Sequence, residues 1–96
     1  MTAPINVTGE ELTTVISPDP TCPGGNIIYK MFFTVDANTT VSLEDVNGVQ
    51  LSGFFDMPEF SSLNWDNDGS PLSTNGLCIR QTNSANIGGI VLFSRS

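Results

Sequence analysis

Two acidic side chains in one turn are the first candidates for chemistry in this 96-residue chain. Asp66 and Asp68 lie within residues 66–70, together with an Asn, a Gly and a Ser. Oxygen donors on a Gly-containing turn suit Ca²⁺, but a twelve-residue calcium loop also needs Gly at its sixth position and Glu at its twelfth. Those positions hold Pro71 and Leu77. The stretch is therefore interpreted as a solvated turn whose Asx side chains cap their own backbone, and no metal site is predicted.

A second pair of carboxylates, Asp56 and Glu59, flanks Met57-Pro58. Paired carboxylates at a suitable separation can hydrolyse glycosides, but no second feature of the sequence supports that reaction here. The chain has no His, and its two Cys cannot complete a four-ligand zinc site by themselves. Most His-based acid–base catalysis is therefore out of reach of a single chain. We expect a protein that is not an enzyme and that has no cofactor.

The charge balance narrows the choice of partners. Ten acidic residues against three basic ones give a net charge of −7 at pH 7. A surface this acidic repels phosphate backbones and anionic lipid headgroups. We therefore expect no nucleic acid and no membrane among the partners. The length allows one domain with one modest core.

The beginning of the chain has neither the basic residues nor the apolar run of a secretory signal. The longest apolar stretch, at residues 27–33, is interrupted by Tyr29 and Lys30 and is too short to cross a bilayer. These features predict synthesis and folding in the cytosol. That compartment favours free thiols for Cys22 and Cys78, although their spacing leaves a disulfide open.

Alternating and β-branched segments, separated by turn residues, recur at intervals of roughly ten residues. The predicted strands are residues 13–16, 26–34, 40–44, 49–55, 60–65, 77–81 and 90–94. No window of sufficient length has helical periodicity, and at most one helical turn is expected, at residues 8–12. The predicted fold class is all-β: a single small antiparallel β-sandwich or barrel of about seven strands.

The pair Asn47-Gly48 predicts a two-residue type I′ hairpin turn, because both central residues of that turn need positive φ. The return strand should place Leu51 and Phe55 on one face, so Phe54 must point the other way. An outward Phe54 would mark a contact surface. The neighbouring rings of Phe60 and Trp65 could join Phe54 and Phe55 in a platform that stacks on a sugar, but we favour the core for these rings.

The strand at residues 26–34 has apolar groups on both faces. Strict alternation puts Met31 and Phe33 on one face, and Ile28 and Phe32 on the other. A single sandwich has only one interior to receive such groups. We therefore expect another chain to cover the second face, and we predict that Ile28, Phe32 and Phe54 are assembly contacts.

From residue 27 to residue 93, the order of features resembles a group of small β-sandwich virion proteins of tailed bacteriophages. The segments with this resemblance are Ile28-Tyr29-Lys30-Met31-Phe32-Phe33, Thr40-Val41-Ser42-Leu43, Val49-Gln50-Leu51-Ser52-Gly53, Asn75-Gly76-Leu77-Cys78-Ile79 and Ser84-Ala85-Asn86-Ile87-Gly88-Gly89-Ile90-Val91-Leu92-Phe93. Residues 1–25 have no counterpart in this pattern. The expected organisation is an N-terminal arm or strand with a Pro-rich loop over residues 1–25, and a β-sandwich domain over residues 26–96.

The resemblance implies a non-enzymatic virion structural protein, above all a capsid decoration or cement protein. The implied partners are the major capsid protein or other virion proteins, together with further copies of the chain in a homo-oligomer. The implied location is the virion, on the capsid exterior or in the head–tail fittings, after synthesis in the host cytoplasm. The alternative is a carbohydrate-binding module or fibre-tip adhesin that presents Trp65 and the Asp66–Asp68 loop to a glycan.

Overall fold

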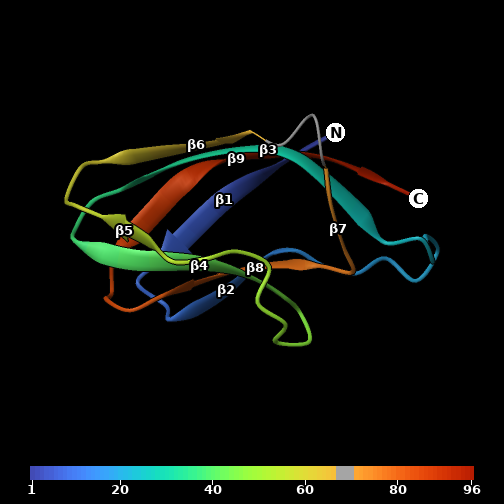
Figure 1. Ribbon diagram of the computed structural model, residues 1–96, viewed down its shortest axis with the longest axis horizontal. Helices are drawn as coiled ribbons and strands as arrows, with labels where there is room; N and C mark the ends of the chain where they lie inside the picture. Colours follow the sequence, from blue (N-terminus) through green and yellow to red (C-terminus); the bar gives the residue numbers. More distant parts are fainter. Residues whose placement is uncertain (67–70) are drawn as a thin grey trace.

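The protein is a β-sandwich of two antiparallel sheets that face each other (Figure 1). The computed structural model describes residues 1–66 and 71–96, and these contain nine strands and no helix. The all-β prediction is therefore confirmed. The predicted turn at residues 66–70 falls mostly outside the described residues, as does Asp68.

The larger sheet has the strand order β1-β9-β3-β6, and the short strand β7 also pairs with β3. The smaller sheet has the order β2-β8-β4-β5. The strands are β1 (Thr2–Thr8), β2 (Leu12–Ile16), β3 (Asn26–Val35), β4 (Thr39–Asp45), β5 (Phe55–Met57), β6 (Ser62–Asp66), β7 (Leu72–Thr74), β8 (Leu77–Gln81) and β9 (Asn86–Arg95). The sequence did not predict β1 or β7.

A register shift in β3 overturns one predicted contact. Its pairing with β9 is regular on both sides but shifts by one residue between Ile28 and Lys30. The extra residue changes the phase of the alternation, so Ile28 and Met31 both face the core. The expectation that Ile28 shares an outward face with Phe32 is therefore wrong, since Ile28 is fully buried. Phe32 does point outward and is 44% exposed.

The N-terminal segment is part of the sandwich. All of β1 pairs with β9, and Ile5 and Val7 are buried in the core. Met1 and Phe93 donate a hydrogen bond to each other's carbonyl, both at 2.9 Å. Because such pairs alternate along antiparallel strands, the nitrogen of Pro4 faces away from β9, where proline removes no sheet hydrogen bond. The first 25 residues thus supply β1 and β2 to the domain and are not a separate arm.

The hairpin after β4 differs from the predicted type I′ turn. Gly48 has φ +87°, whereas the φ of Asn47 is not positive. The Gly48 amide donates to the Asp45 carbonyl at 3.0 Å, and the Asp45 amide donates to the Val49 carbonyl at 2.8 Å. This is a three-residue loop with Gly48 in the left-handed position. The chain then makes a single bridge at Gln50 before β5, so residues 49–55 are not one strand.

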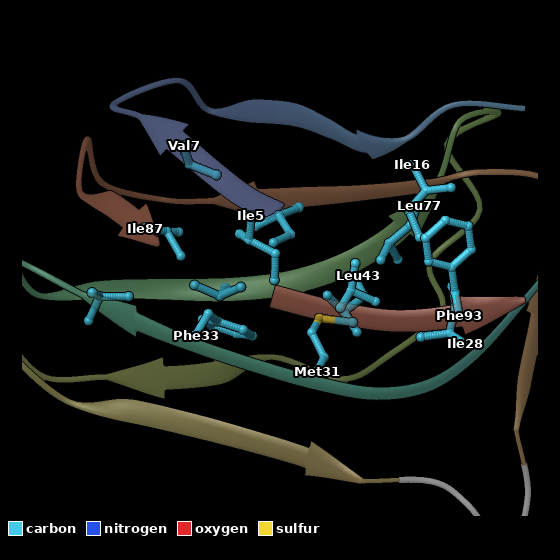
Figure 2. Close-up of a cluster of buried hydrophobic side chains, with 14 of the residues drawn as sticks. Ile5, Val7, Ile16, Ile28, Met31, Phe33, Leu43, Leu77, Ile87 and Phe93 are labelled. Atoms are coloured by element: carbon cyan, nitrogen blue, oxygen red, sulfur yellow. The ribbon is translucent and has the colours of Figure 1, made fainter. Parts of the chain in front are cut away.

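The core lies between the two sheets, where β3 and β9 meet β4 and β8 (Figure 2). Phe33, Leu43 and Leu77 are fully buried there. At the β3–β9 pair the backbones are too close for a side chain on Gly89. An ideal Cβ on this residue would lie 2.0 Å from the Phe32 carbonyl oxygen and 2.7 Å from the Phe33 Cα.

One buried amide joins three segments at an end of the sandwich. The Gln81 side-chain oxygen accepts from the Thr39 hydroxyl and the Ala85 amide, both at 3.0 Å. Its nitrogen donates to the carbonyls of Glu10 at 2.9 Å and Ala85 at 2.8 Å. Gln81 therefore satisfies polar groups of β4, of the loop after β8 and of the turn between β1 and β2.

Cys22 and Cys78 are free thiols, as the sequence favoured. Cys78 is buried on β8, where its sulfur lies 3.5 Å from the Thr14 hydroxyl, whereas Cys22 is half-buried in the loop between β2 and β3. The described part of the chain contains no helix able to span a membrane.

We predict that Gly89→Ala destabilises the fold by about 3 kcal/mol or more, because the new methyl group would collide with the β3 backbone. Gly88→Ala is the matched control, since its Cβ would meet nothing within 4 Å. The control should change stability by less than about 1 kcal/mol. Thermal and urea denaturation of both variants would measure the difference. Equal stability would contradict the close packing of β9 on β3.

We predict that Gln81→Leu destabilises the fold by at least about 2 kcal/mol, because it leaves several buried donors and acceptors without partners. Gln50→Leu is the control, because Gln50 is exposed. Its effect should stay within about 0.5 kcal/mol. Urea denaturation followed by tryptophan fluorescence would report both. A loss for Gln81→Leu no larger than the control's would show that the amide does not join the segments.

Candidate functional site: the outer face of the larger sheet

The side of the larger sheet that points away from the core is here called the outer face. Strand alternation and register place on it Thr2, Pro4 and Asn6 of β1, Gly88, Ile90 and Leu92 of β9, Lys30, Phe32 and Thr34 of β3, and Ser62, Asn64 and Asp66 of β6. All twelve are exposed. This sheet therefore has one side in the core and one side in solvent.

The centre of the outer face is apolar. Phe32 lies directly across from Ile90, and Leu92 is the next outward residue of β9. Their exposed fractions are 44%, 49% and 38%. A shallow groove of about 310 Å³ runs beside these side chains. The residues that line it are Thr2, Lys30, Met31, Phe32, Asn64, Ile90 and Leu92.

The twelve described residues of the outer face have no net charge, although the chain has a net charge of −7. The ionisable side chains among these twelve are Lys30 and Asp66, whose ammonium nitrogen and carboxylate oxygen lie 3.8 Å apart. The other two basic residues pair away from this face: Arg80 with Glu44 and Glu11, and Arg95 with Asp19. The excess of negative charge therefore lies on the rest of the molecule.

The predicted assembly contacts do not form one site. Phe32 lies at the centre of the outer face, whereas Ile28 is in the core. Phe54 is 67% exposed, but it directly precedes β5 of the smaller sheet. The sequence missed the two other apolar members of the face, Ile90 and Leu92. The sequence does show that Ile90 and Leu92 alternate with Gly89 and Val91. Only the pairing of Ile90 with Phe32 shows that they lie on the outer face.

The residues of the glycan alternative point in different directions. Trp65 is paired with buried Met31 and packs against the core, so its ring is half-buried on the inner face of β6. Asp66 is the next residue, and it points outward beside Lys30. Trp65 and Asp66 therefore do not form one platform; the exposed ring diagonal to Asp66 on the outer face is that of Phe32, which lies across from Asn64.

Among residues 1–66 and 71–96, no three Cys, Asp or Glu side chains are grouped as metal ligands. The Thr8 hydroxyl donates to the Glu10 carboxylate at 2.8 Å and lowers the pKa of Glu10. In the same way the Thr21 hydroxyl, at 2.7 Å, lowers the pKa of Asp19. Both carboxylates stabilise local turns, and neither belongs to the outer face.

Phe60 is the most exposed of the large apolar residues in the described part of the chain, at 77%, and it has an unusual backbone. Its φ is +61°, the left-handed region that bulky residues seldom adopt. Its amide donates to the Val35 carbonyl at 3.0 Å, and the Ser61 amide donates to the Pro58 carbonyl at 3.1 Å. These bonds fix the turn before β6 but involve no ring atom. The expectation that Phe60 belongs to the core is therefore wrong.

We predict that Phe60→Asn stabilises the isolated protein by about 1 kcal/mol, because Asn tolerates the left-handed conformation that costs other L-residues about 1–2 kcal/mol. The melting temperature should rise by roughly 4–8 °C. Phe54→Asn is the control, since Phe54 is also exposed but its φ is not positive. A control that rises as much as Phe60→Asn would contradict the strain.

Comparison of the chain with models of protein families, with curated proteins and with solved structures gives no significant match. The functional interpretation therefore depends on the geometry and chemistry of the chain itself.

Proposed function

We propose that this chain is a non-enzymatic virion structural protein that acts by contact through the outer face, most specifically a capsid decoration or cement protein. The observation that supports this proposal is a sheet face whose centre is apolar and whose described residues have no net charge, on a strongly acidic domain. Its partners in this proposal are the major capsid protein or other virion proteins, and its location is the virion.

The physical argument begins with the exposed side chains. Phe32, Ile90 and Leu92 form a continuous row across two neighbouring strands. Monomeric soluble proteins seldom expose large contiguous apolar patches, and such patches mark contact sites. Each square ångström of apolar surface that a partner covers contributes about 25 cal/mol. The face thus offers binding energy that the isolated chain does not use.

The distribution of charge supports the same assignment. Burying an unpaired charge in an interface is costly, and the charged side chains among the twelve described residues of the outer face are the paired Lys30 and Asp66. The acidic remainder of the surface disfavours adhesion to the packaged DNA of a virion. No nucleic acid or membrane is therefore among the proposed partners.

The carbohydrate-binding alternative has no such support. A sugar-binding platform needs an aromatic ring face open to solvent, and Trp65 packs against the core. Phe32 does expose a ring, with Ile90 across from it on β9 and Asn64 across from it on β6. It is not one of the residues on which this alternative was based, Trp65 and the Asp66–Asp68 loop.

We predict that Phe32→Ser removes the protein from its particle while leaving the fold intact. The side chain lies on the outside of the sheet, so the melting temperature should fall by only a few degrees, whereas occupancy should fall at least tenfold. Thr34→Ser, on the same strand and face, is the control and should keep full occupancy.

The measurement is the copy number of each variant on purified phage particles, with a melting curve of the free protein. Particle imaging of the unmodified protein would locate the contact. Full occupancy of a folded Phe32→Ser variant, or absence of the unmodified protein from particles, would overturn the proposal.

A further inference from the structure

Two Asn-Gly pairs occur in the chain, Asn47-Gly48 and Asn75-Gly76. An Asn that is followed by Gly is prone to deamidation, because glycine has no side chain to hinder the attack of its own backbone nitrogen on the Asn side chain. The reaction needs no enzyme and no cofactor. Both pairs have this intrinsic chemistry, so a difference between them in the folded protein must come from the structure.

The reaction is a transfer within the chain. The glycine nitrogen loses its proton and bonds to the Cγ atom of Asn, and the bond from Cγ to the side-chain nitrogen breaks, so that ammonia leaves and a succinimide ring remains. Water then opens the ring at either carbonyl carbon, which gives Asp or isoaspartate. One ammonia is released, one water is consumed, and the mass of the chain rises by about 1 Da. The peptide bond between Asn and Gly must be able to turn toward the Asn side chain for the ring to close.

The Asn47-Gly48 pair lies in the hairpin after β4, which projects away from the larger sheet (Figure 1). Both residues are exposed, and an added Cβ on Gly48 would meet nothing within 4 Å. The side-chain amide of Asn47 makes no hydrogen bond with the described residues. It can therefore turn toward the Gly48 nitrogen without displacing a neighbour or breaking a bond of its own.

The Asn75-Gly76 pair lies in a packed connection between β7 and β8. Gly76 is buried, and an ideal Cβ on it would lie 2.6 Å from the Val46 Cγ1 and 2.8 Å from the Ile16 carbonyl oxygen. The Asn75 carbonyl accepts a hydrogen bond from the buried side-chain amide of Asn26 at 2.7 Å. Turning this peptide bond would leave that buried amide without its partner, which is costly. The fold thus opposes ring closure at Asn75.

The hairpin is restrained by one residue, Asp45. Its carboxylate oxygen Oδ1 accepts from the amides of Asn47 at 2.8 Å and Val49 at 3.0 Å, and its backbone carbonyl accepts from the Gly48 amide at 3.0 Å. The bond to Gly48 must open before that nitrogen can attack. Exposed loops open locally at little cost in free energy while the rest of a domain stays folded. The Asp45 carboxylate therefore slows the reaction without preventing it.

We propose that Asn47 is a deamidation site of the folded protein and that Asp45 sets the rate. The product adds one negative charge to the net charge of −7, and the isoaspartate form also inserts a carbon atom into the backbone of the three-residue loop. This inference is independent of the proposed function, because the hairpin belongs to the smaller sheet and supplies none of the twelve residues of the outer face.

The test is incubation of the full chain at 37 °C, at pH 7.4 and at pH 9, followed by trypsin digestion and tandem mass spectrometry. Asn47 and Asn75 stay in one tryptic peptide, residues 31–80, so its fragment ions compare both positions in the same molecules. A sample digested before incubation corrects for conversion during digestion. Asn47 should convert at least tenfold faster than Asn75 at each pH. Its rate should be higher at pH 9, because the attacking nitrogen must lose its proton.

Two controls separate the effect of the fold from the intrinsic chemistry. In urea that unfolds the chain, the two Asn residues should convert at similar rates. Asp45→Ala should speed the conversion of Asn47 at least threefold in the folded protein, because it frees the amides of the loop. Asp56→Ala, at another exposed Asp of the smaller sheet, should leave the rate unchanged. Slow conversion of Asn75 in both variants would show that their folds are intact.

Conversion of Asn75 as fast as that of Asn47 in the folded protein would overturn the inference. So would an Asn47 that stays intact in the folded protein while the urea-unfolded chain converts. A rate at Asn47 that is the same in Asp45→Ala as in the unmodified chain would overturn the role of Asp45. None of these results bears on the proposed function, which is decided by the occupancy of Phe32→Ser on particles.

Discussion

The pairing of β3 with β9 is the constraint on which the rest of the structure depends. These two ten-residue strands lie at the centre of the larger sheet, and Gly89 allows their backbones to pack closely. The register shift after Ile28 sends that residue and Met31 to the same side. Without the shift, one end of β3 would turn its apolar side chains to solvent. A single extra residue thus lets one strand fill the core along its length and still present Phe32 outside.

Outside the β3–β9 pair, hydrogen bonds and ion pairs hold the segments of the molecule together. The Gln81 amide joins three segments at one end of the sandwich, and its four hydrogen bonds leave no amide atom of that side chain without a partner. The three basic side chains are each bound by carboxylates, among them Arg80, whose bond with Glu44 raises its pKa. The apolar side chains of the outer face are not what sets this surface apart, because the core contains more of them. The twelve described residues of the outer face are distinguished by having no net charge in a chain whose net charge is −7.

The sequence predicts the strands in which side chains alternate regularly between the two faces. Alternation at residues 40–44 and 77–81 correctly places β4 and β8, because each pairs over most of its length without a bulge. Alternation cannot show which face Ile28 occupies, because residues 26–34 have apolar side chains at both odd and even positions. It also misses β1, where Pro4 interrupts an otherwise regular alternation and is tolerated only because the strand lies at an edge. Of the predicted assembly contacts, only Phe32 lies in the candidate site, and Asp66, named for the glycan alternative, lies at its edge on β6. Its remaining members depend on register, which is a property of two strands and not of one.

The mutual hydrogen bonds of Met1 and Phe93 have a mechanical consequence. They hold the beginning of β1 against the last part of β9, so the two chain ends lie at the same end of one antiparallel pair (Figure 1). A force that pulls the ends apart would open that pair one hydrogen-bonded step at a time, beginning at Met1, and would meet little resistance. A force applied across the outer face would instead be shared by four strands at once. A fusion partner or tether that pulls the two termini apart would therefore act on the β1–β9 pair in the direction that separates its hydrogen bonds one after another.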